Sequence, residues 1–142
     1  MNVRVEKLSP EAWKPLSENA HLIAFNEIKK AETDRIDFAL LAVKGHADLL
    51  GYITCKEHDS ETVYWQYGGA FPGTRETSLS YLGYMAFVAY CKERYKSIVT
   101  VIENDNFPML KMAMKVGFKI IGLRYYSGNK STILLEHILE FA

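Results

Sequence analysis

Residues 102–122, IENDNFPMLKMAMKVGFKIIG, predict a helix followed directly by a strand. Asn106 stands at the position of a helix N-cap, and apolar residues follow it at helical spacing. Gly117 and Phe118 end this helix, as expected for a glycine C-cap with a packed aromatic residue. The unit therefore places an amide side chain at one end of a helix and an aromatic ring under the other end.

The size and charge of the chain indicate an ordinary globular protein. With 142 residues, of which 49% are hydrophobic and 24% are charged, we expect one domain spanning residues 1–142 around a single core. The formal net charge is zero, so we expect neither a nucleic-acid partner nor a membrane surface. No apolar stretch approaches the roughly 20 residues of a membrane-spanning helix, and no signal-peptide pattern is visible. We therefore expect a cytoplasmic protein in which Cys55 and Cys91 are reduced and buried.

The remaining elements follow from hydrophobic periodicity and turn residues. Val3 and Val5 predict a first strand, Ser9 caps a helix that runs to about residue 19, and a second helix covers residues 21–31. We predict further strands over residues 38–43, 49–56, 62–67, 98–102, 118–124 and 132–139, and a helix over residues 78–95. Gly68 and Gly69 end the 62–67 strand in this prediction. This order predicts an α/β (α+β mixed) fold with a mixed sheet, helices on both faces and a central β-α-β crossover.

The passage from the 62–67 strand into the 78–95 helix is the first candidate site. Its loop is rich in small and turn-forming residues, and the first N–H groups of the following helix have no partner within the helix. Such a terminus binds phosphate, and Arg75 stands close enough in sequence to support a pyrophosphate. The alternative is a plain strand-to-helix turn.

Over nearly its whole length, the chain resembles the GNAT N-acyltransferase superfamily. Residues 75–80 (RETSLS) stand where the family has a Gln/Arg-x-x-Gly-x-Gly/Ala pyrophosphate loop, although Ser78 and Ser80 replace both glycines. Asn106 and Gly117-Phe118 also keep the family's spacing, in which this Asn faces the pantetheine arm. The resemblance implies a mostly antiparallel sheet of six to seven strands and acetyl-CoA as co-substrate. The implied cofactor-binding residues are Ala70, Phe71, Arg75, Glu76, Thr77, Ser78, Leu79, Ser80 and Asn106.

The resemblance also implies direct attack of a primary amine on the acyl thioester. Members often carry a Tyr seven positions after the Asn, which protonates the departing thiolate, and Ala113 occupies that position here. The candidate catalytic residues are therefore Tyr67 and Tyr64 on the strand, with Tyr81 and Tyr84 on the helix as further substitutes. All four can equally be packing aromatics. The oxyanion would meet a backbone N–H near Gly69 or Ala70, and candidate bases are His21, Glu27, Asp34 and His58, which can equally be solvated surface residues.

The acceptor is open: it can be a small-molecule amine or an amine of a peptide or protein. The spacing of the His and Cys residues predicts no metal site. A homodimer through exchange or edge pairing of the 132–139 strand is a further option. Because Ser78, Ser80 and Ala113 depart from the family pattern, the alternative function is a catalytically impaired GNAT-like module that binds acyl-CoA or another protein.

Overall fold

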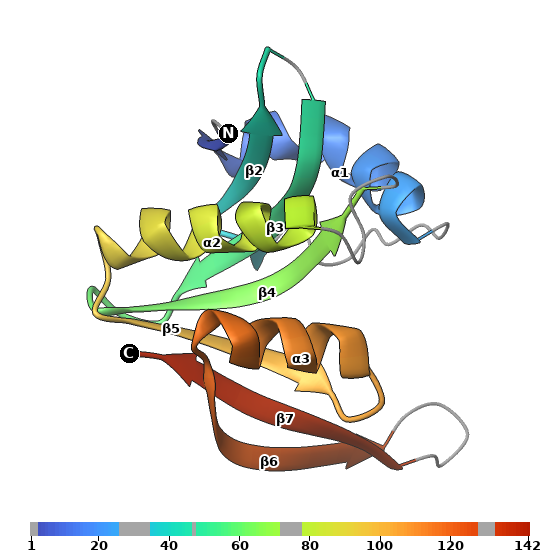
Figure 1. The fold of residues 1–142 in the computed structure, drawn as a ribbon, viewed down its shortest axis with the longest axis vertical. Helices are drawn as coiled ribbons and strands as arrows, with labels where there is room; N and C mark the ends of the chain where they lie inside the picture. Colours follow the sequence, from blue (N-terminus) through green and yellow to red (C-terminus); the bar gives the residue numbers. More distant parts are fainter. Residues whose placement is uncertain (1–2, 26–34, 47, 72–77, 128–132) are drawn as a thin grey trace.

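Seven strands form one mixed sheet in the order β1-β2-β3-β4-β5-β7-β6 (Figure 1). The computed structural model describes residues 3–25, 35–46, 48–71, 78–127 and 133–142; side chains are described outside residues 18–25 and 125–136. The strands are β1 (Val3–Leu8), β2 (Phe38–Lys44), β3 (Asp48–Glu57), β4 (Thr62–Ala70), β5 (Ser97–Glu103), β6 (Lys119–Ser127) and β7 (Ile133–Phe141), and the helices are α1 (Pro10–Phe25), α2 (Ser78–Lys92) and α3 (Phe107–Val116).

Every neighbouring pair of strands is antiparallel except β4 and β5, which run parallel and are joined by α2. Helices α2 and α3 lie on one face of the sheet and α1 lies on the other (Figure 1). The predicted fold class, with its central crossover and helices on both faces, is confirmed. None of the described helices is long and apolar enough to cross a membrane.

The sheet carries a buried cluster on each face, because successive side chains of its central strands point to opposite faces and helices cover both. Under α2 and α3, Leu40, Trp65 and Ile98 belong to the larger cluster. On the α1 face, Trp13 packs its ring 5.2 Å from that of Tyr52 in a smaller cluster. The run of six buried residues that opens β2 shows that this strand is covered on both faces.

Helix α1 corrects the prediction of two helices separated near residue 20. Its start is as predicted, since the Ala12 N–H donates to Ser9 Oγ at 3.2 Å. The helix then continues through Asn19 and Ala20 to Phe25, with Pro15 inside it. Asn is a mediocre helix former and Ala a good one, so nothing at these positions forces a break. Residues 26–31 of the predicted second helix lie outside the described part of the chain.

Two boundaries near the candidate site also differ from prediction. Strand β4 continues through Gly68 and Gly69 to Ala70, because both glycines pair with β3. Helix α2 ends at Lys92 instead of residue 95, and the Tyr95 N–H donates to the carbonyl of Cys91. Cys55 and Cys91 are free and buried, as predicted.

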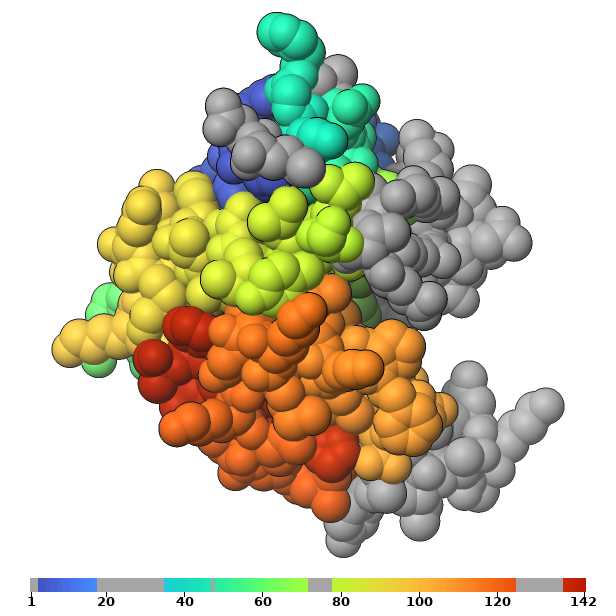
Figure 2. Space-filling model, viewed as in Figure 1, coloured from blue at the N-terminus to red at the C-terminus, as the bar shows by residue number. Residues whose placement is uncertain are grey.

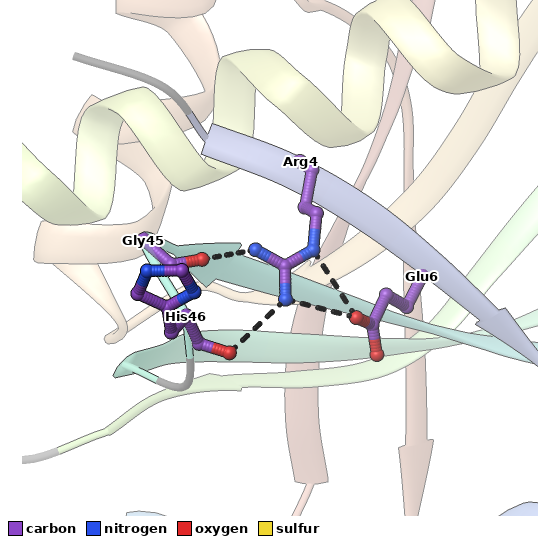
Figure 3. A network of polar contacts seen from close by, with 4 residues as sticks. All are labelled: Arg4, Glu6, Gly45 and His46. Atoms are coloured by element: carbon purple, nitrogen blue, oxygen red, sulfur yellow. Dashed lines mark hydrogen bonds and ion pairs between the residues drawn. The ribbon is translucent and has the colours of Figure 1, made fainter.

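The two edges of the sheet are β1 and β6. Along β1, the Arg4 guanidinium donates to the carbonyls of Gly45 and His46 in the β2–β3 connection and pairs with Glu6 at 3.2 Å (Figure 3). Strand β7 lies between β5 and β6, so both of its edges are already paired. The last strand is therefore not an edge of this sheet, and a homodimer through exchange of that strand stays a prediction.

Candidate functional site

The parallel strands β4 and β5 separate at one point, and this divergence defines the site. Their pairing runs from Thr62 opposite Ser97 to Trp65 opposite Thr100. Beyond that pair, β4 continues to Ala70 and β5 to Glu103, and the two strands diverge (Figure 1). The Thr100 hydroxyl donates to the Trp65 carbonyl at 3.2 Å, so a side chain closes the last step of the pairing.

A register shift between Thr54 and Cys55 of β3 determines which N–H groups of β4 face β3 beyond Trp65. The Tyr67 N–H donates to Thr54 Oγ1 at 3.1 Å, and the Phe71 N–H donates to the Leu50 carbonyl at 3.0 Å. Because N–H groups alternate along a strand, the Gly69 N–H is directed at β3 and the Ala70 N–H at the side from which β5 has diverged. Of the two predicted oxyanion donors, this geometry favours Ala70.

The N-termini of α2 and α3 lie at the same end of the sheet. Each helix runs antiparallel to the strand before it, so both begin near the carboxyl ends of β4 and β5 (Figure 1). Ser78, Leu79 and Ser80 form the first turn of α2, and Asn106 caps α3. Two helix N-termini at the divergence provide partial positive charge, which favours an anionic ligand.

The ends of α3 confirm the local predictions. Asn106 Oδ1 accepts a hydrogen bond from the Met109 N–H at 3.3 Å, so the predicted capping role is present. Gly117 has a φ of 125° and its N–H donates to the carbonyls of Ala113 and Met114. Phe118 is buried against Trp65, with ring centroids 5.5 Å apart. These contacts hold the C-terminal end of α3 against the core cluster that contains Trp65.

On the outer surface, α2 and α3 lie side by side (Figure 2). The Lys115 ammonium lies 4.7 Å above the centroid of the Tyr81 ring and so links the two helices. Lys111 is exposed one turn nearer the N-terminus of α3. It is therefore the better placed of these two lysines to meet an anion at the divergence.

Beneath the two helices, the predicted Tyr position is filled by the Ala113 methyl group, which has no exposed surface. Tyr84, from α2, is buried in the same cluster. Its hydroxyl has no hydrogen-bond partner in the described part of the chain, and burial raises its pKa. The structure places Tyr84 on the buried side of α2 with Gly83, Phe87, Val88 and Cys91, which the sequence alone did not predict. Nothing in the sequence signals the missing partner of its hydroxyl.

The other face of β4 carries the two predicted catalytic residues. Val63 and Trp65 point into the α2/α3 cluster, so Tyr64, which lies between them, points to the α1 face. Tyr67 pairs with Thr54, whose neighbours Ile53 and Cys55 both face α2, so Tyr67 also lies on the α1 face.

Of the other predicted site residues, the structure describes His58 and Phe71 near these two tyrosines, and several others lie outside the described residues. The exposed His58 contacts the Tyr64 ring edge-on, at 5.4 Å between centroids. The Phe71 side chain is buried in the α1 cluster, so only its backbone can contact a cofactor. Arg75, Glu76, Thr77, Glu27 and Asp34 lie outside the described residues, as does the side chain of His21.

The two thiols form a buried pair between β3 and α2. Burial and a hydrogen bond with Cys91 raise the pKa of Cys55. The same bond lowers the pKa of Cys91, as does the indole N–H of Trp65, which lies 3.4 Å from Cys91 Sγ. This pair anchors the C-terminal half of α2, away from the divergence.

Comparisons with known proteins agree on the fold. No protein-family model matches the sequence, and no curated protein matches it. A GNAT family acetyltransferase from Elizabethkingia anophelis, solved with acetyl-CoA bound, is 18% identical with a TM-score of 0.75, and the match covers 98% of this chain and 97% of that one. Arabidopsis thaliana NAA60 in complex with acetyl-CoA is 14% identical with a TM-score of 0.71 and 99% coverage of both chains.

The ribosomal-protein-S18-alanine N-acetyltransferase from Escherichia coli is 11% identical with a TM-score of 0.72, and the match covers 98% of this chain and 92% of that one. These structures show that the chain has the GNAT acetyltransferase fold over its whole length. The resemblance drawn from residues 75–80 and from the Asn106 and Gly117 unit is thus confirmed at the level of the fold.

Proposed function

We propose that this protein transfers an acetyl or other acyl group from acyl-CoA to a primary amine. The observation that carries the proposal is the divergence of β4 and β5 directly after the Trp65–Thr100 pair, with two helix N-termini at the same end. The structural neighbours solved with acetyl-CoA support the same cofactor here. The amine attacks the thioester carbonyl directly, a C–N bond forms, and the C–S bond breaks to release the thiolate.

The residues around the divergence have separate roles in this proposal. The first turn of α2, from Ser78 to Ser80, binds the pyrophosphate together with Arg75, and Lys111 offers a further cation. The Asn106 side chain amide contacts the pantetheine while its oxygen caps α3. The Ala70 N–H receives the developing oxyanion. The main catalytic contribution is alignment of the amine and the thioester, for which effective molarities reach roughly 10⁵–10⁸ M.

Tyr64 and Tyr67 lie on the α1 face of β4, and we assign them to the amine side of the site. Because Trp65 separates this face from α2 and α3, these two phenols suit the side from which the amine arrives. His58, whose ring contacts that of Tyr64, is proposed to accept the amine proton, since imidazole is the most common general base. The acceptor itself is a small molecule, a peptide or a protein.

Isothermal titration calorimetry with acetyl-CoA tests the cofactor assignment. We expect binding in the micromolar range and a loss of roughly tenfold in Arg75→Ala, because a cation near phosphate is removed. Arg94→Ala is the matched control, since Arg94 lies beyond the opposite end of α2, with its guanidinium 3.7 Å from the Tyr90 ring centroid. Absence of acetyl-CoA binding by the wild type would refute the proposal.

A second candidate function is an acyl-CoA-binding or protein-interaction module without catalysis. The observation that favours it is Ala113, which places no proton donor on α3. Release of free thiol from acetyl-CoA in the presence of an amine and peptide panel separates the two. Turnover above the rate without protein supports the enzyme, and tight binding with no turnover for any acceptor supports the module.

A further inference from the structure

The buried hydroxyl of Tyr84 makes no hydrogen bond within the part of the chain that the structure describes. Tyr84 is 8% exposed, and its hydroxyl has no partner among the residues that the structure describes. Buried polar groups are nearly always hydrogen-bonded, so each exception needs an explanation. An unpaired hydroxyl that costs stability is expected where a ligand supplies the missing partner.

The surroundings of Tyr84 place it at the seam where the site opens. Its ring meets Trp65 edge-on at 5.2 Å and lies 6.0 Å from the Phe118 ring below α3. Trp65 is the last β4 residue that pairs with β5. Side chains on a helix lean toward its N-terminus, and the N-terminus of α2 is at the diverging end of the strands. Tyr84 therefore leans toward the opening between β4 and β5.

Ala113 explains why this hydroxyl can act at the seam. Both residues belong to the cluster between the two helices and the sheet, and Ala113 contributes only a methyl group from α3. The side chain of Ala113 has no exposed surface, so a larger residue there would crowd this cluster. The phenol can thus come from α2 where none comes from α3.

We infer that Tyr84 donates the proton to the departing sulfur of acyl-CoA, taking the role that Ala113 leaves empty. The inference rests on the proposed function. As the C–S bond breaks, the phenol O–H donates to sulfur and the sulfur takes its proton. The attacking nitrogen loses its proton to the base on the amine side, and the phenolate regains a proton from that base through water, so that amine and acyl-CoA give amide and CoA thiol.

The other three tyrosines near the site fit this role less well. Tyr64 and Tyr67 lie on the α1 face of β4, on the opposite side of the sheet from α2 and α3. The ring of Tyr81 is covered by the Lys115 ammonium on the outer side of the helices. Tyr84 alone of the four combines a buried position on the helix face with an unpartnered hydroxyl in the described structure.

A binding experiment tests the inference without an acceptor. CoA and desulfo-CoA, which lacks the sulfur, are titrated into wild type, Tyr84→Phe and Tyr90→Phe at a pH high enough to ionise the CoA thiol. A hydrogen bond to a thiolate is charge-assisted, so Tyr84→Phe should weaken CoA binding about tenfold and leave desulfo-CoA unchanged. Tyr90→Phe, on the same helix, should change neither. Equal effects on both ligands, or no effect on either, would overturn the inference.

Turnover and stability provide a second, independent readout. With any acceptor found, Tyr84→Phe should lower kcat about a hundredfold or more with KM for acetyl-CoA unchanged. Its thermal midpoint should be equal to or above that of the wild type, because an unpaired hydroxyl is removed. A wild-type rate in Tyr84→Phe would refute the role of Tyr84. So would a lower thermal midpoint in this variant, because it would show that the hydroxyl has a hydrogen-bond partner in the folded protein. Failure of the wild type to bind acetyl-CoA would instead refute the proposed function itself.

Discussion

Substitution of Gly117 tests how α3 is fixed over the site. Gly117 has a φ of 125°, a conformation that residues with a Cβ rarely adopt. A Cβ at this position would lie 2.9 Å from Cε2 of Phe141, closer than non-bonded atoms tolerate. Gly117→Ala therefore combines backbone strain with crowding of an aromatic ring in the core cluster.

Gly45 provides a matched control that isolates the crowding. Its φ is 63°, and a Cβ there would meet no atom within 4 Å. Gly45→Ala should cost about 1 kcal/mol, the usual penalty of a left-handed conformation. Gly117→Ala should cost about 2–4 kcal/mol, because strain and overpacking each contribute roughly 1–3 kcal/mol.

Urea denaturation of both variants measures these free energies, and thermal unfolding should show losses of about 3 °C per kcal/mol for a chain of this size. In a Phe141→Leu background, the smaller side chain should reduce the cost of Gly117→Ala but leave that of Gly45→Ala unchanged. Equal losses for the two glycine variants would show that the contact with Phe141 does not constrain this helix end.

Three further predictions concern stability near the site. Asn106→Ala should lose about 1 kcal/mol in urea denaturation because the cap to Met109 is lost, whereas Asn106→Asp should retain most of it; equal losses would contradict the cap. Trp65→Phe should lose about 1 kcal/mol or more because the indole donor to Cys91 and part of the core packing disappear, and an unchanged stability would contradict that contact. Burial raises the pKa of Tyr84 above its unfolded value of about 10, so the folded state holds this proton longer and stability should fall as pH rises beyond about 10. That slope should be shallower in Tyr84→Phe, and an identical slope would contradict the shift.

The helix α3 unit could be predicted because its signals are local. Asn106 caps the helix, and the positive φ of Gly117 ends it, so neighbouring residues decide both boundaries. The mixed sheet was also accessible, since the crossover through α2 requires parallel strands and the hairpins require antiparallel ones. The position of β7 between β5 and β6 was not predicted. These features depend on chain geometry more than on distant contacts.

The end of β4 could not be predicted because distant contacts decide it. Gly68 and Gly69 read as a turn by composition, yet they pair with β3 in close approach. A Cβ at Gly51 would lie 2.6 Å from the Gly69 carbonyl oxygen, and one at Gly68 would lie 3.0 Å from the Tyr52 oxygen. Glycine is required here because the backbones of β3 and β4 approach closely, and this approach cannot be inferred from a single sequence.

The missing Tyr at Ala113 shows the same limit at the level of chemistry. A motif assigns a role to a position in the sequence, whereas the reaction needs a group at a position in space. Helices α2 and α3 run parallel and share one cluster above the β4–β5 seam, so a hydroxyl can reach that space from either helix. The two faces of β4 then divide the reaction: Tyr64 and Tyr67 face the side proposed for the amine, and Tyr84 faces the side proposed for the sulfur. If this division is correct, substitutions of Tyr67 should alter the preference among acceptors, while Tyr84→Phe should slow every acceptor by the same factor.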